Sequence, residues 1–61
     1  MTTTAAELVH NQTPYGEKPD MSLIEDYKGH ETYDSLDRWI CVFPDGSTLT
    51  EDPTYGVEVH T

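Results

Sequence analysis

The segment from residue 38 to residue 50 constrains the fold more than any other part of this chain. Residues 38–43 are dense in β-branched and aromatic side chains, and residues 47–50 return to an extended pattern after a Pro-Asp-Gly sequence. Pro44 fixes the φ angle that the second position of a type I turn needs, and Gly46 supplies the positive φ angle of a G1 bulge. The segment therefore predicts a β-hairpin that turns at residues 44–46.

Weaker patterns flank this hairpin. Residues 55–60 alternate between apolar and polar side chains, which predicts a further strand, and an irregular strand is expected near residues 32–33. Apolar residues spaced three apart within residues 21–27 predict a short helix capped by Asp20 or Ser22, and Thr4 with Glu7 resembles a capping box. We expect an α+β fold, in which a small three- to four-stranded antiparallel β-meander in the C-terminal half carries one short N-terminal helix or helical turns.

The chain length bounds the domain organisation. A chain of 61 residues has room for one small core, so a partner would help to stabilise it. We expect residues 1–19 to form a flexible or partner-ordered segment, and residues 20–61 to form the domain. Both faces of the strand at residues 39–43 are apolar, and a sheet this small cannot cover both. The alternatives for covering the second face are a second copy of the chain and a target. The favoured cover is a set of helical side chains: Leu8, Met21, Leu23 and Ile24.

The charge of the chain selects among classes of partner. Twelve Asp and Glu residues oppose three Lys and Arg residues, giving a net charge of −9, and the acids are interleaved with aromatic residues instead of forming a tail. Such a surface repels nucleic acid and anionic membranes. The charge therefore favours a basic protein surface as the partner.

No pattern in the sequence indicates catalysis, a cofactor or a metal site. Cys41 lies within an apolar run, where a thiol packs as a small hydrophobic group, and the glycines do not form a phosphate-binding loop. The three histidines and Cys41 lack the close pair of ligands that zinc modules use. We therefore expect a protein that is not an enzyme and holds neither a cofactor nor a metal.

The same features bear on localisation. A single cysteine, a polar start without an apolar leader, and the lack of an apolar stretch of about 20 residues predict a cytoplasmic protein without a membrane span. If the chain is encoded by a phage, the compartment is the cytoplasm of the host cell.

The candidate site is a negative face with aromatic anchors. Carboxylates on a folded surface reach spacings similar to those of phosphates, and aromatic side chains supply much of the energy at protein interfaces. The predicted acidic contacts fall within one window of the chain: Glu17, Asp20, Glu25, Asp26, Glu31, Asp34 and Asp37. The predicted aromatic contacts are Tyr27, Tyr33 and Tyr55.

In broad composition the chain resembles the small inhibitors that bacteriophages make against host nucleic-acid machinery. These include nucleic-acid mimics that block restriction, repair or RNA-guided (CRISPR) defence. The resemblance implies an inhibitor that occupies a basic nucleic-acid-binding groove. The alternative is a generic small acidic adaptor or subunit that docks through an apolar sheet face and uses its charge for solubility. Both interpretations stay open, as does a homodimer formed through residues 55–60.

Overall fold

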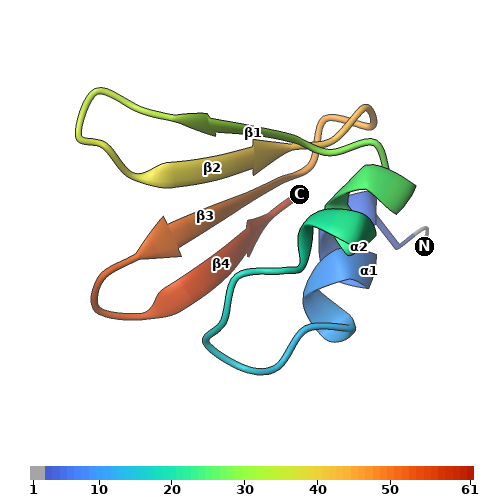
Figure 1. Ribbon diagram of the computed structural model, residues 1–61, viewed down its shortest axis with the longest axis horizontal. Coiled ribbons are helices and arrows are strands. Elements are labelled where there is room, and N and C mark those ends of the chain that lie inside the picture. Colours follow the sequence, from blue (N-terminus) through green and yellow to red (C-terminus); the bar gives the residue numbers. More distant parts are fainter. Residues whose placement is uncertain (1–2) are drawn as a thin grey trace.

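Two short helices precede a four-stranded antiparallel sheet in the computed structural model, which describes residues 3–61 (Figure 1). The strands follow one another across the sheet in the order β1-β2-β3-β4, so the sheet is a simple meander. This arrangement confirms the predicted α+β fold. The elements are α1 (Ala5–Asn11), α2 (Met21–Asp26), β1 (His30–Tyr33), β2 (Trp39–Val42), β3 (Thr48–Asp52) and β4 (Gly56–His60).

The hairpin between β2 and β3 turns at the predicted residues. The Phe43 N–H donates to the Ser47 carbonyl over 3.0 Å, and the Gly46 N–H donates to the Phe43 carbonyl over 3.0 Å. Gly46 has a φ angle of +90°, as a G1 bulge requires. Local chemistry at Pro44 and Gly46 therefore sets the register of the central pair of strands.

The hairpin between β1 and β2 repeats this geometry without a glycine. The Asp34 N–H donates to the Arg38 carbonyl over 3.1 Å, and the Asp37 N–H donates to the Asp34 carbonyl over 2.9 Å. Asp37 has a φ angle of +61° and occupies the position that Gly46 takes in the other hairpin. Asp is one of the few residues other than glycine that tolerate this conformation. The turn places Leu36 before the start of β2, outside the sheet.

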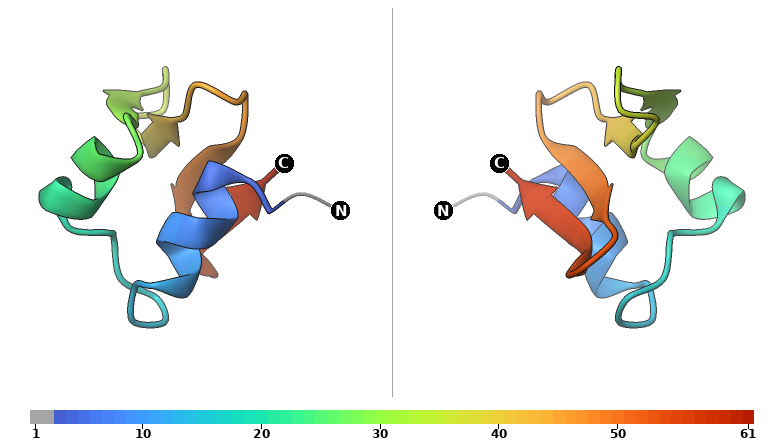
Figure 2. Two further views of the ribbon diagram at one scale, coloured as in Figure 1. Left: turned by 90° about the vertical axis from the view of Figure 1, so that its right-hand side faces the viewer. Right: turned by 90° about the vertical axis from the view of Figure 1, so that its left-hand side faces the viewer.

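The helices cover one face of the sheet, as Figure 2 shows. Side chains at alternate positions of β2, β3 and β4 point into this layer and meet apolar side chains of α1 and α2. The buried core consists of Ala6, Val9, Ile24, Trp39, Cys41, Phe43, Leu49 and Val57.

The opposite face of the sheet is not covered by any described residue. Val42 is 40% exposed there, and Ile40 is half-buried. The prediction that helical side chains cover this second face is wrong, because both helices pack on the first. Of the four side chains expected there, Ile24 is buried in the core and Leu23 packs beside it, whereas Leu8 and Met21 are exposed.

Helix α1 is held to the sheet by its first turn. The Ala5 N–H donates to Asp45 Oδ2 over 2.9 Å, and the Ala6 N–H donates to Ser47 Oγ over 3.1 Å. The Glu7 N–H donates to Thr4 Oγ1 over 3.3 Å, which confirms the predicted cap at Thr4. Residues of the β2–β3 turn therefore satisfy two of the N–H groups that the start of a helix leaves unpaired. The independent flexibility of residues 1–19 stays a prediction.

Helix α2 begins after Asp20 and ends in a Schellman motif. The Lys28 N–H donates to the Glu25 carbonyl over 3.0 Å, and the Gly29 N–H donates to the Ile24 carbonyl over 2.8 Å. Lys28 adopts the left-handed conformation, with a φ angle of +60°. Gly29 serves packing instead, because a Cβ atom there would lie 2.8 Å from Ile24 Cγ2 and from Phe43 Cε1.

Candidate protein-binding surface

Four of the seven predicted acids lie on α2 and the loop that leads into it. They are exposed, and none has a side-chain hydrogen bond or ion pair within residues 3–61. We call them the α2 patch: Glu17, Asp20, Glu25 and Asp26. A hollow of about 260 Å³ borders the patch and is lined by Glu17, Asp20, Lys18 and Leu23, among others.

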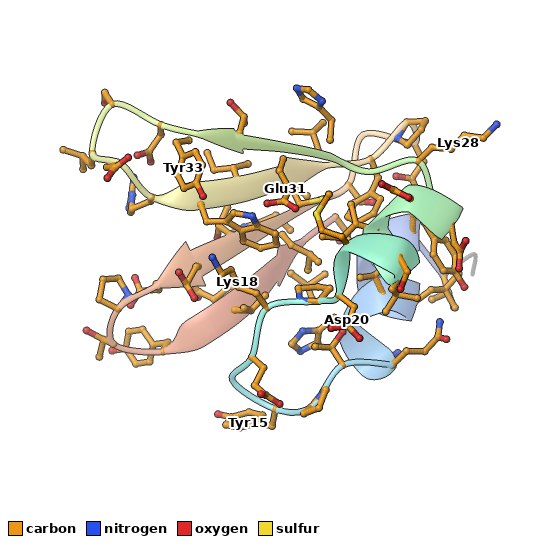
Figure 3. The ribbon with its side chains drawn as sticks, viewed as in Figure 1. Tyr15, Lys18, Asp20, Lys28, Glu31 and Tyr33 are labelled. Atoms are coloured by element: carbon orange, nitrogen blue, oxygen red, sulfur yellow. The ribbon has the colours of Figure 1, made fainter. Side chains whose placement is uncertain are left out.

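The other three predicted acids lie elsewhere, and two of them have structural roles. Glu31 is half-buried on the helix-covered face of β1, where its Oε2 accepts the indole N–H of Trp39 over 2.8 Å (Figure 3). Asp34 accepts the Arg38 backbone N–H and the Leu36 N–H within its turn. Asp37 is exposed in the same turn. The seven acids therefore do not form one continuous face.

Asp34 also forms the one ion pair found within residues 3–61. Its Oδ2 lies 2.8 Å from Arg38 Nε, and both side chains are partly exposed. The backbone N–H of Arg38, followed by its side chain, holds the pKa of Asp34 below the usual value. Arg38 is thus committed within the fold.

Lys18 is the second cation with an internal contact. Its Nζ lies 5.7 Å from the centre of the Trp39 ring, within cation–π range. With Arg38 paired to Asp34, Lys28 is the remaining cation, and it is exposed. Lys18 lines the hollow beside Glu17 and Asp20, and Lys28 follows α2, so the four carboxylates of the α2 patch face two nearby cations.

The predicted aromatic contacts also separate. Tyr27 packs against the core, and its hydroxyl accepts a hydrogen bond from Gln12 Nε2 over 3.2 Å. Tyr33 and Tyr55 are 58% and 73% exposed, and they lie on β1 and on the β3–β4 turn. Tyr33 is therefore well separated from α2 along the long axis of the molecule (Figure 3).

The sequence pattern did not place Leu36 on the surface at this far end. Leu36 is 71% exposed, and Lys18, Glu51 and Asp52 line the same hollow as Leu36. The signal for Leu36 was the Asp-Ser-Leu-Asp sequence of residues 34–37, because Asp residues that start and end a four-residue segment favour a turn. Read as a turn, this sequence would have placed Leu36 at an exposed tip.

The single thiol of the chain, Cys41, lies buried in the core. Burial raises the pKa of Cys41 to about 11, with a further contribution from the negative charge of Glu31, so the thiol stays protonated. Within residues 3–61, no three His, Cys, Asp or Glu side chains stand close enough to hold a metal ion. Over the same part of the chain, no helix has the length and apolar character needed to cross a membrane.

Comparisons with protein-family models, with curated proteins and with solved structures give no match to this chain.

Proposed function

We propose that this protein is a small acidic inhibitor that binds the basic nucleic-acid-binding groove of another protein. The observation that carries the proposal is the uncompensated charge: the net charge is −9, and one ion pair forms within residues 3–61. In this mechanism the carboxylates of the α2 patch occupy positions that phosphates would take. The inhibitor and the polynucleotide then compete for the same Lys and Arg side chains.

The dimensions of α2 are compatible with this mechanism. Asp20 is the N-cap of α2, and Glu25 and Asp26 are its last two residues, so the three acids span about 9 Å at 1.5 Å per residue. One strand of DNA carries about three phosphates over that length, at one per 3.4 Å. Three carboxylates on α2 therefore match the charge of a short stretch of one strand.

The proposed partners are host defence or DNA-handling complexes. RNA-guided nucleases hold the guide and target in a positively charged channel, and restriction enzymes bind the DNA backbone in a similar way. The compositional resemblance to phage inhibitors points to an anti-restriction or anti-CRISPR role. Binding to the folded state would also stabilise a domain of this size by mass action.

A matched pair of double variants tests this proposal. Glu25→Gln with Asp26→Asn removes two charges from the α2 patch, and Glu7→Gln with Glu58→Gln removes two charges from elsewhere. Both variants have the same net charge, −9 + 2 = −7. We expect the immobilised wild-type protein to capture polynucleotide-binding proteins from a bacterial lysate at 50 mM salt and to release them by about 500 mM, where the Debye length is shorter.

The two variants should then behave differently toward a captured protein. The α2 variant should bind it about tenfold more weakly than the wild type, which corresponds to a loss of about 1.4 kcal/mol of specific contact. The control variant should bind within about twofold of the wild type. Equal losses in both variants would mean that only net charge matters. Capture that is insensitive to salt would contradict the mechanism outright.

The open face of the sheet supports a second candidate function. Val42 and Ile40 lie on this face without a cover from the described residues, as an adaptor that docks through apolar contacts would require. In that case Val42→Thr, which keeps a β-branched shape, should abolish partner binding, and the two double variants should retain it. This pattern of results would favour the adaptor over the inhibitor.

A further inference from the structure

The sheet divides between its two hairpins at the end opposite the helices. Pairing between β2 and β3 ends where Ile40 faces Thr50. Pairing continues further within each hairpin, to Trp39 beside Tyr33 in one and to Asp52 beside Gly56 in the other. The hairpins therefore diverge, as the left side of Figure 1 shows.

A cavity of about 430 Å³ lies at this end of the sheet. It falls in the size range of small-ligand and side-chain pockets. We call it the hairpin cleft, and its principal lining residues are Lys18, Tyr33, Leu36, Trp39, Glu51 and Asp52.

Exposed apolar side chains gather around the hairpin cleft. Tyr33 and Leu36 line it and are 58% and 71% exposed. Tyr15 and Tyr55, at 93% and 73% exposure, each precede a glycine that lines the cleft. Those glycines touch, because a Cβ atom on Gly56 would lie 3.3 Å from the Cα atom of Gly16. Two of the seven exposed large apolar side chains of residues 3–61 thus line the cleft, as at a binding surface, whereas the Tyr15 side chain lies apart from it (Figure 3).

The charge around the cleft selects the kind of partner that fits. Asp37, Glu51 and Asp52 line it, together with Lys18 and Arg38. Arg38 is paired with Asp34, so the group comprises four carboxylates and two cations and carries a net charge of −2. A cationic segment is therefore attracted to this cleft and an anionic segment is repelled.

The internal contact of Lys18 illustrates the chemistry that the cleft offers. Its ammonium group stands 5.7 Å from the centre of the Trp39 ring. The indole N–H is held by Glu31, so the ring is fixed in orientation. Trp39 is 2% exposed, so a lysine or arginine of a partner reaches the ring only by taking the place of Lys18, beside the same carboxylates.

We infer that the hairpin cleft docks a segment of the partner protein in which Lys or Arg residues flank one aliphatic or aromatic side chain. This inference rests on the proposed function, in which the partner surface is basic, and adds a second contact at the far end of the molecule from the α2 patch. The apolar side chain of that segment would enter between Tyr33 and Leu36. Its cations would face Asp37, Glu51 and Asp52.

Titration of the intact protein with short blocked peptides tests the inference. The probes are Gly-Arg-Leu-Lys-Gly, the same peptide with Gly in place of Leu, and Gly-Glu-Leu-Glu-Gly. The reporter is the indole N–H resonance of Trp39, the single tryptophan of the chain. We expect a saturable shift with the first peptide, binding at least tenfold weaker with the second, and no saturable shift with the third.

Two variants locate the binding. Leu36→Ser should weaken binding of the first peptide at least fivefold, and the turn position of Leu36 makes the fold tolerant of the change. Met21→Ser, which also removes an exposed apolar side chain but lies on α2, should bind as the wild type does. Unchanged binding to Leu36→Ser, equal binding of the acidic peptide, or no response of Trp39 to any peptide would overturn the inference.

The outcome is independent of the test of the α2 patch. If the peptides fail to bind but captured proteins are still lost with Glu25→Gln and Asp26→Asn, the cleft is wrong and the proposed function stands. If the peptides bind but capture does not respond to salt, the cleft stands and the mimicry fails.

Discussion

Replacement of Ser47 by alanine should destabilise the protein severely, even though Ser47 lies 41 residues from the helix that it supports. Ser47 is 2% exposed, its Oγ accepts the buried N–H of Ala6, and its hydroxyl donates to Asp45 over 2.6 Å. The substitution leaves the Ala6 N–H without an acceptor in a place that water does not reach. An unpaired buried donor costs about 1–3 kcal/mol.

This cost is large for a chain of this size. The core of a domain shorter than about 70 residues rarely supplies more than about 3–5 kcal/mol of net stability. A loss of about 2 kcal/mol would lower the Tm by roughly 8–16 °C, at about 4–8 °C per kcal/mol for a small domain. Urea unfolding followed by the fluorescence of Trp39 would measure the change in free energy.

The matched control is Ser35→Ala. Ser35 is an exposed serine of the β1–β2 turn, and its replacement should change the unfolding free energy by less than about 0.5 kcal/mol. If Ser47→Ala is as mild as this control, α1 is not held to the sheet by the contacts described above.

Further predictions concern the backbone, a thiol and pH. Lys28→Gly should raise the unfolding free energy by about 1 kcal/mol because Lys28 has a φ angle of +60°. Gly29→Ala should lower the unfolding free energy by about 1–3 kcal/mol because the added Cβ atom overpacks the core. Urea titration distinguishes the two signs. Cys41, with its pKa raised to about 11, should resist iodoacetamide at pH 8 in the native protein and react once urea unfolds it, and rapid native labelling would contradict its burial. Hydrogen bonds from Arg38 lower the pKa of Asp34, and hydrogen bonds from Ala5 and Ser47 lower the pKa of Asp45. The stability that each carboxylate contributes is therefore complete above its unfolded pKa and is lost as pH falls through its lower folded pKa. Acid titration of Asp34→Asn and Asp45→Asn should show a shallower loss of stability than acid titration of the wild type.

The sequence predicted those parts of the fold that depend on neighbouring residues. The turn at residues 44–46 follows from the fixed φ angle of Pro44 and the positive φ angle of Gly46, and both act within the turn itself. The cap at Thr4 is likewise local. The β1–β2 turn was harder to predict because Asp37 occupies the left-handed position, where a glycine would have been an obvious signal.

Contacts between distant residues could not be predicted in this way. Nothing in the order of residues reveals that Asp45 and Ser47 receive the N–H groups of α1, or that both helices pack on the same face. The candidate site shows the same division. The acidic window could be recognised from the sequence. The division of its acids between α2 and the β1–β2 turn could not, because exposed carboxylates follow no periodicity that packing would impose.

Displacement of polynucleotide is the measurement that tests the central proposal most directly. A protein captured from the lysate is first saturated with a fluorescent duplex or guide-bound target. The fluorescence anisotropy of this polynucleotide is then followed as the acidic protein is added. The account predicts that the anisotropy falls to the value of free polynucleotide, with Glu25→Gln and Asp26→Asn together requiring about tenfold more protein. A stable complex that contains both the polynucleotide and the acidic protein would contradict it.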